Sequence, residues 1–127
     1  MKSLLVDISR CEVAEVDITN YKDFYVLINC SCFDVARRQI GNEKRYYDIF
    51  VDDMGMLRGE RIVSAVDKNC EVMLVGNLVI TKTDEAGEQI DLSNDDIEYL
   101  KHYILLGISE DSNGYPHVHP VLTQVSY

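Results

Sequence analysis

The sequence predicts an α+β fold, with a mainly antiparallel sheet of about five to six strands and two helices packed on one face of that sheet. Apolar and polar residues alternate along several short segments, as they do in half-buried strands. Two other segments repeat apolar residues at helical spacing behind a capping residue. The 127 residues suffice for one hydrophobic core, because a second core would leave each half too small to bury enough surface.

The N-terminal part of the chain predicts two strands followed by a helix. Ser3 to Ile8 and Glu12 to Ile18 carry β-branched residues in near alternation. Thr19 then stands where a helix N-cap belongs. Apolar residues recur at helical spacing as far as Asn29, namely Tyr21, Phe24, Leu27 and Ile28. We expect a first helix of about ten residues here.

The next segments predict a hairpin. Phe33 to Ile40 alternates in polarity, and Tyr46 to Val51 has the aromatic and β-branched residues of a buried strand. Gly41 and Asn42 between them suit a hairpin turn. Acids and a glycine from Asp52 to Gly55 then indicate a tight reversal of the chain.

The second half of the chain predicts the most buried strand and the second helix. Glu71 to Thr83 is the most apolar segment, and it is interrupted by Gly76 and Asn77, which permit a bulge or a tight hairpin. Ser93 opens a capping box with acids in the first helical turn. The pattern predicts a helix from about Asn94 to Leu106, ended by Gly107.

We expect residues 1–107 to form a single α+β domain and residues 108–127 to be a C-terminal extension. The extension opens with a polar cluster that contains a glycine and ends in spaced apolar residues, namely Val118, Val121, Val125 and Tyr127. Such a segment is either a flexible tail or a last strand that pairs with a sheet edge in the same or another protomer. We favour the docked strand.

The charge of the chain bears on its partners and location. The formal net charge of -10 and the pI of about 4.6 repel phosphate backbones and anionic lipids, so neither nucleic acid nor a membrane is an expected direct partner. An acidic surface favours solubility, or it docks on a basic partner in imitation of nucleic acid. The N-terminus lacks the apolar run of a secretory signal, so we expect a cytoplasmic protein with reduced cysteines.

One part of the sequence concentrates positive charge beside aromatic rings. Arginine forks and tyrosine rings together suit a phosphate, a nucleotide or an acidic protein patch. The same charges on a hairpin edge would discourage unwanted strand pairing. If the protein has a ligand site, we expect it to use residues of this region and two later arginines, namely Arg37, Arg38, Arg45, Tyr47, Arg58 and Arg61.

Catalytic and metal-binding patterns are weak. His117 and His119 would share one face of a strand and could chelate zinc together with Cys30 or Cys32, but no Cys-x-x-Cys pair is present. The acid pairs Asp52-Asp53 and Asp95-Asp96 stand where turns and helix caps already require them, and Cys32 has an anion, Asp34, where an activating cation would be needed. We therefore expect no metal, no cofactor, no catalytic residue and no enzymatic activity.

Three segments resemble a known family. They are Tyr47 to Leu57, Val75 to Ile80 and Asp91 to Glu98. Over about residues 4–103 the chain is similar to domain of unknown function 3846, a family common in phages and mobile elements. Its members have a strand ending in an acid-glycine turn, an apolar strand with a glycine, and a closing helix. They commonly carry Asn-Arg after the turn, whereas this chain keeps only the arginine, Arg61.

The resemblance implies a setting more than an activity, because small accessory proteins of phages often bind and blunt host defence machinery. We expect a non-catalytic binding protein of phage or mobile-element origin in the host cytoplasm. It would bind a host protein or sequester a small anionic signal such as a nucleotide. The eight tyrosines favour interfaces, and we expect a homo-oligomer. The alternatives are a metal-dependent hydrolase that uses the two histidines and an acid pair, and an acidic inhibitor that mimics nucleic acid.

Overall fold

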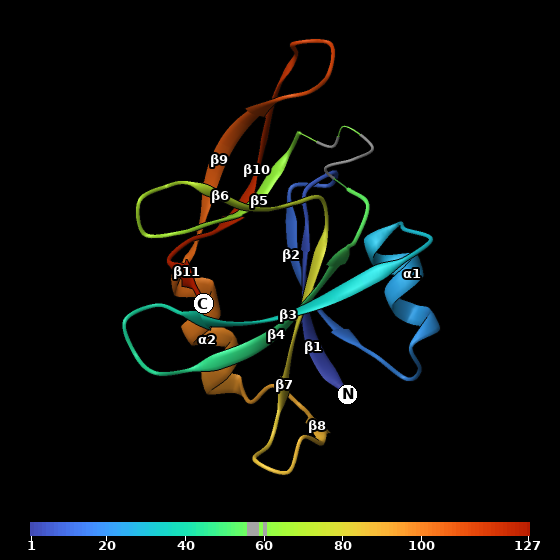
Figure 1. The fold of residues 1–127 in the computed structure, drawn as a ribbon, viewed down its shortest axis with the longest axis vertical. Helices are drawn as coiled ribbons and strands as arrows, with labels where there is room; N and C mark the ends of the chain where they lie inside the picture. The colour runs from blue at the N-terminus through green and yellow to red at the C-terminus, as the bar shows by residue number, and fades with distance from the viewer. Residues whose placement is uncertain (56–58, 60) are drawn as a thin grey trace.

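Two sheets and two helices make up the part of the chain that the structure describes (Figure 1). The structure is a computed structural model, and it describes residues 1–55, 59 and 61–127. In chain order the elements are β1 (Lys2–Asp7), β2 (Glu12–Asp17), α1 (Lys22–Ile28), β3 (Phe33–Ile40), β4 (Tyr46–Asp52), β5 (Val63–Val66), β6 (Val72–Val75), β7 (Leu78–Thr83), β8 (Gln89–Ile90), α2 (Asn94–His102), β9 (Ile104–Glu110), β10 (Pro116–Leu122) and β11 (Val125–Ser126).

The strands form a large and a small sheet. Among the described residues, the large sheet has seven strands in the order β11-β3-β4-β7-β1-β2, with β8 beside β7, and all its pairs are antiparallel. The small sheet has four strands in the order β6-β5-β10-β9, and its β10–β5 pair is parallel. The mainly antiparallel mixture of strands and helices was predicted. The single sheet of five to six strands was wrong, because an alternation pattern identifies strands but does not say which strands pair.

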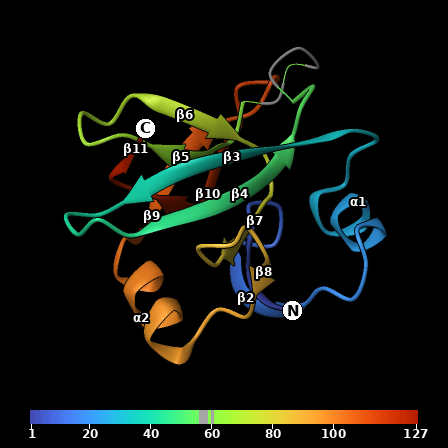
Figure 2. The same cartoon turned by 60° about the horizontal axis from the view of Figure 1, so that its bottom comes forward.

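The two helices pack on opposite faces of the large sheet, so the prediction of both helices on one face was also wrong. Neighbouring residues of a strand point to opposite faces. In β1, Leu4 belongs to the buried cluster that includes Leu100 of α2, whereas Leu5 belongs to the cluster that includes Phe24 of α1. The strands β1 and β7 are buried almost throughout, as expected for a sheet that is covered on both sides. Figure 2 shows the two helices well apart on either side of the strands.

The small sheet covers the same face of the large sheet as α2. Ala65 of β5 and Leu122 of β10 are fully buried, and they belong to the same cluster as Leu4, Ile49 and Leu100. The main core therefore lies between the large sheet on one side and α2 with the small sheet on the other. Phe24 and Phe50 stack at 4.0 Å between ring centroids in the second, smaller core under α1.

Local turn and cap chemistry was predicted better than the lengths of helices. The capping box at Ser93 is confirmed, and β3 pairs with β4 as the predicted hairpin. The predicted helix to Leu106 is too long, because α2 ends at His102 and the apolar run after it forms β9. Thr19 is not the N-cap of α1. Tyr21 holds that position, and Thr19 donates to the carboxylate of Asp23 instead.

Among the described elements the chain passes between the two sheets four times, and two of these passages use short connections that the sequence did not reveal. At Gly76, where φ is +79°, it leaves β6 of the small sheet and enters β7 of the large sheet, so Gly76 and Asn77 form neither a bulge nor a hairpin between paired strands. After β10 it returns to the large sheet, where Val125 of β11 pairs with Ile40 of β3. Residues 108–127, which were predicted to be an extension, contain the end of β9 and all of β10 and β11.

Candidate functional site

The predicted arginine cluster does not form one site. Arg37 and Arg38 are neighbours in β3 and point to opposite faces of the large sheet. Arg37 donates to the hydroxyl of Thr83 at 3.2 Å, and its guanidinium lies 5.7 Å from the ring centroid of Tyr46. Arg38 stacks 4.4 Å above the ring of Tyr127 instead. The sheet thus separates these two arginines.

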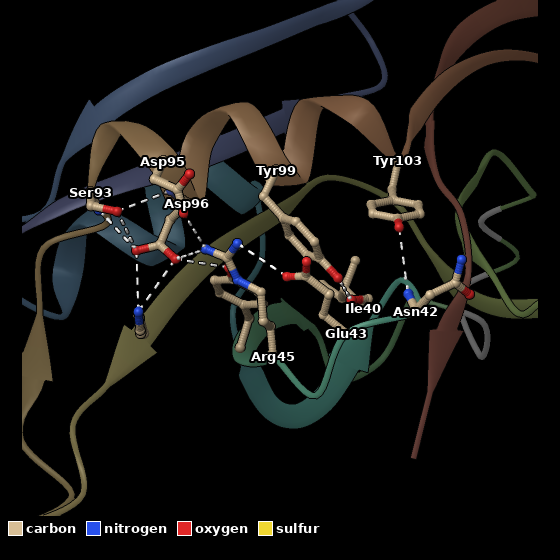
Figure 3. A network of polar contacts seen from close by, with 11 residues as sticks. Ile40, Asn42, Glu43, Arg45, Ser93, Asp95, Asp96, Tyr99 and Tyr103 are labelled. Atoms are coloured by element: carbon tan, nitrogen blue, oxygen red, sulfur yellow. Dashed lines mark hydrogen bonds and ion pairs between the residues drawn. The ribbon is translucent and has the colours of Figure 1, made fainter.

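Arg45 and Tyr47 lie in a third place, around the carboxylate of Asp96 (Figure 3). The Asp96 side chain is 2% exposed. Its Oδ1 accepts hydrogen bonds from Arg45 Nη2 at 2.8 Å and from the Tyr47 hydroxyl at 2.9 Å. Lys82 Nζ lies 3.3 Å from both carboxylate oxygens. The network joins α2 to β4 and β7.

Asp96 also closes the capping box of α2. Its Oδ2 accepts from the backbone N–H of Ser93 at 3.0 Å and from the Ser93 hydroxyl at 2.9 Å. The Asp96 N–H donates in return to Ser93 Oγ at 3.0 Å. One carboxylate therefore caps a helix, pairs with two cations and satisfies a buried phenol.

The pKa values in this network follow from burial and hydrogen bonding. Burial alone would raise the pKa of Asp96, but the hydrogen bonds from Ser93, Arg45 and Tyr47 outweigh burial and hold the pKa well below its ordinary value. Burial raises the pKa of Tyr47, and its bond to the Asp96 carboxylate raises it further. Asp96 is therefore ionised and Tyr47 protonated at neutral pH, and neither group is poised for proton transfer.

Two tyrosines of α2 and its C-terminus lock the β3–β4 turn against this network. The Tyr99 hydroxyl donates to the carbonyl of Ile40 at 2.6 Å, and the Arg45 guanidinium lies 4.1 Å from the Tyr99 ring centroid. Gly41 has a φ of +78°, and a Cβ there would lie 2.5 Å from ring atoms of Tyr103. Only glycine fits this turn, because both the backbone conformation and the space exclude a side chain. The arrangement holds the fold together.

A cavity of about 620 Å³ lies where loops of both sheets meet. Two of the segments that carry the family resemblance reach it, through Gly55 and Asn77, and Arg61 also lines it. The volume is in the range of small-molecule sites. However, Asp52 and Asp111 line it as well, so the described lining has more negative than positive charge. Arg58, also predicted as a ligand residue, lies outside the described residues.

The polar groups of this cavity are largely engaged within the protein. Asn77 accepts from the N–H of Ile8 at 2.9 Å and donates to the carbonyl of Leu27 at 3.1 Å. Asp111 Oδ2 lies 2.7 Å from Nε2 of His117, and this bond, with those from backbone N–H groups, holds the pKa of Asp111 below its ordinary value. These contacts connect the loops to each other, and they engage polar groups that an anion would otherwise use.

The two histidines proposed as metal ligands have separate partners. His117 is paired with Asp111, whereas His119 is buried, with its Nε2 2.7 Å from the hydroxyl of Ser109. The described residues contain no group of three or more His, Cys, Asp or Glu side chains that could hold a metal ion. Nor does the described part of the chain contain a helix with the length and apolar character that a membrane crossing requires.

The β9–β10 hairpin carries an exposed apolar face that sequence reasoning missed. Leu106 is 73%, Ile108 72% and Val118 53% exposed. Ile108 lies opposite Val118, and Leu106 lies opposite Pro120, so these side chains share one face of the hairpin. Figure 1 shows the hairpin projecting beyond the large sheet. The run from Ile104 to Ile108 could have indicated a strand, but we assigned its first part to the helix.

The comparisons with known proteins identify a family. A model of the family described as Domain of unknown function (DUF3846) matches residues 1–105, which is most of the chain. Neither the curated proteins nor the solved structures yielded a match. The match ends within β9, so β10 and β11 lie beyond it. The chain therefore belongs to the DUF3846 family, whose function is unknown.

Proposed function

We propose that this chain is a non-catalytic binding protein that docks on a partner protein through the apolar face of the β9–β10 hairpin. The observation that carries the proposal is the exposure of Leu106, Ile108 and Val118 side by side on one face. Single exposed apolar residues are ordinary, but a contiguous group on a projecting element is typical of protein interaction sites. Burial of each such side chain against a partner contributes about 1.5–3 kcal/mol.

A small anionic ligand has less support than a protein partner. Three of the arginines predicted to bind it, Arg37, Arg38 and Arg45, lie in three separate places, and Arg45 is already paired with Asp96. The cavity lined by Arg61 also contains two carboxylates. The hairpin, in contrast, needs no rearrangement before it can meet a surface.

The biological setting of the proposal comes from the family resemblance. A phage or mobile-element protein in the host cytoplasm would meet host proteins, and a host defence protein is the partner that this setting favours. A net charge of -10 assists approach to a basic surface. The apolar face would then supply most of the affinity.

The test compares two purified double variants with the wild type. Leu106→Thr with Ile108→Thr makes the hairpin face polar and places residues of high strand propensity at both positions. Val26→Thr with Val72→Thr is the matched control, because these valines are 80% and 52% exposed elsewhere on the surface. Each immobilised protein is exposed to host lysate, retained proteins are identified by mass spectrometry, and the purified partner is titrated against each variant.

We expect the hairpin variant to bind the purified partner roughly tenfold more weakly or worse, and the control to bind as the wild type does. Equal binding by both variants would refute the hairpin as the docking surface. A salt titration separates the acidic-mimic alternative, because binding through surface charge weakens steeply with ionic strength and binding through an apolar face does not.

A further inference from the structure

The outer edge of β9 differs from the other sheet edges. Within the part of the chain that the structure describes, β9 pairs only with β10 and leaves its other side open over seven residues. No charged side chain occurs from Ile104 to Ser109. The opposite edge of the small sheet, β6, has four residues. In the large sheet β11 covers only two residues of β3, and the rest of that β3 edge carries the charged residues Asp34, Arg37 and Arg38. Long uncharged edges are unusual, because such an edge readily pairs with another strand.

The β2 edge of the large sheet shows how this protein protects a long edge. Three acids occur within its six residues, namely Glu12, Glu15 and Asp17. Like charges on an edge repel an incoming copy of the same strand. Charged side chains are thus present along the long β2 edge and absent from Ile104 to Ser109 of β9.

The hydrogen-bond pattern shows which backbone groups of β9 face outward. Two hydrogen bonds just beyond the ends of the β9–β10 pairing show which residue pairs are bonded. Thr123 N–H donates to the Tyr103 carbonyl at 2.8 Å, and Asp111 N–H donates to the Tyr115 carbonyl at 2.9 Å. Antiparallel pairs alternate between bonded and non-bonded. Odd-numbered residues of β9 therefore bond to β10. The even-numbered ones direct their N–H and C=O groups to the open edge, namely Ile104, Leu106, Ile108 and Glu110.

We propose that this edge pairs with the β9 edge of a second copy of the chain, antiparallel and centred on Gly107, so that two small sheets become one continuous sheet. In this register Leu106 lies opposite Ile108 of the second copy. Every outward N–H and C=O from Ile104 to Glu110 then finds a backbone partner. The two Gly107 residues face each other at the two-fold axis as a non-bonded pair, where strands approach most closely.

The charges at the two ends of β9 favour a second copy over an unrelated strand. Lys101 and His102 precede the strand, Glu110 is its last residue, and Asp111 follows it. Antiparallel pairing of two identical strands brings the basic end of each towards the acidic end of the other. The overall charge of -10 opposes association, so this local complementarity is what specifies the contact.

The inference goes beyond the proposed function, because it uses the backbone edge of the hairpin and not its apolar face. Pairing within the plane of the sheet leaves the side chains of Leu106 and Ile108 exposed. The two hairpins would then present one apolar face of twice the extent. Two-fold presentation also strengthens binding to a partner that has two sites.

Two substitutions of Ile108 distinguish pairing through the backbone edge of β9 from contact through its apolar side chains. Ile108→Pro removes an N–H that points outward and that β10 does not use, and proline is tolerated in edge strands at such positions. Ile108→Thr keeps the N–H and removes only apolar surface. The mass of each protein in solution is measured by analytical ultracentrifugation over a wide range of concentration. Reducing agent is included because Cys11, Cys32 and Cys70 are exposed.

We expect twice the chain's 14.5 kDa for the wild type and for Ile108→Thr, and the single-chain mass for Ile108→Pro. A wild type that stays monomeric, or a folded Ile108→Pro protein that stays dimeric, would overturn the inference. Amide exchange of the unmodified protein gives a second test that needs no variant. The N–H groups of Leu106 and Ile108 should be protected at high concentration and lose protection on dilution.

The failures of the two proposals are distinguishable. If the wild type is monomeric and the Leu106→Thr with Ile108→Thr variant loses partner binding, the dimer proposal fails and the docking-face proposal stands. If Ile108→Pro disrupts the dimer but the threonine substitutions leave partner binding unchanged, the dimer proposal stands and the docking-face proposal fails.

Discussion

Around Asp96 a carboxylate is buried among cations and a phenol, whereas on the β9–β10 hairpin leucine and isoleucine side chains lie in solvent. The two regions follow each other in the chain, since β9 begins just after α2 ends. In the first region every contact satisfies a partner within the protein. In the second, the apolar side chains find too few partners within the chain to cover them. The difference indicates that the first region maintains the fold, whereas the second is the surface for which we propose a docking role.

The largest effect on stability should come from Asp96→Ala. The change leaves the Tyr47 hydroxyl buried without this acceptor, removes one carboxylate partner from both Arg45 and Lys82, and opens the capping box. We expect a loss of roughly 3 kcal/mol in the free energy of unfolding, measured by urea denaturation. Asp95→Ala is the matched control, because Asp95 is 80% exposed and accepts a hydrogen bond from the same Arg45 Nη2 at 3.1 Å. A similar loss in both variants would contradict the central place of Asp96.

Lowering the pH should weaken the same network. The folded-state pKa of Asp96 is below its value in the unfolded chain, so its contribution is complete above the unfolded pKa of about 4 and is lost as the pH falls towards the folded value. Asp96→Asn should therefore flatten the fall in stability below about pH 5. Some slope should remain, since hydrogen bonds also lower the pKa values of Asp23 and Asp111. Denaturation curves at several pH values measure the slope, and parallel slopes in both proteins would contradict the assignment.

Tyr47→Phe should have a smaller effect. It removes one buried hydroxyl that donates to Asp96 at 2.9 Å and leaves the other bonds of the carboxylate in place. We expect a loss of about 1 kcal/mol in the free energy of unfolding. Tyr46→Phe, at a neighbouring and 42% exposed position, serves as the control and should change little. Equal stability of Tyr47→Phe and wild type would show that the hydroxyl contributes nothing net.

The smallest effect should come from the hairpin. Leu106→Thr with Ile108→Thr should change the free energy of unfolding of dilute protein by less than about 0.5 kcal/mol, because both side chains are already more than two thirds exposed. Thermal and urea denaturation check this expectation. A loss comparable to that of Asp96→Ala would mean that the hairpin face is packed, and the contrast between the two regions would fail.

Features that depend on adjacent residues were predicted from the sequence, and features that depend on distant pairing were not. The Ser93 capping box and the hairpin through Gly41 use residues close together in the chain, so their chemistry is visible in the sequence. The ion pair between Arg45 and Asp96 joins residues that are far apart in the sequence, and no local sequence pattern indicates it. The same limitation explains why the sequence did not reveal the contacts of Arg45 and Tyr47 with Asp96.

Two features of the structure could have been recognised from the sequence. The continuous apolar runs of β1 and β7, such as Leu78 to Ile80, are typical of strands buried on both faces, and they indicate packing elements on both sides. Arg37 and Arg38 are consecutive in a strand, so the pattern already places their side chains on opposite faces of the sheet. The end of α2 was harder to place, because an apolar run after a helix fits a further turn or a new strand equally well.

The position of β10 has a consequence for synthesis of the protein. Since β10 lies between β5 and β9, the small sheet cannot close until residues 116–122 have left the ribosomal exit tunnel. Leu122 and Val125, which complete the main core, are also translated after nearly everything that they cover. A nascent chain that stalls before them would display its unfinished interior to chaperones and proteases.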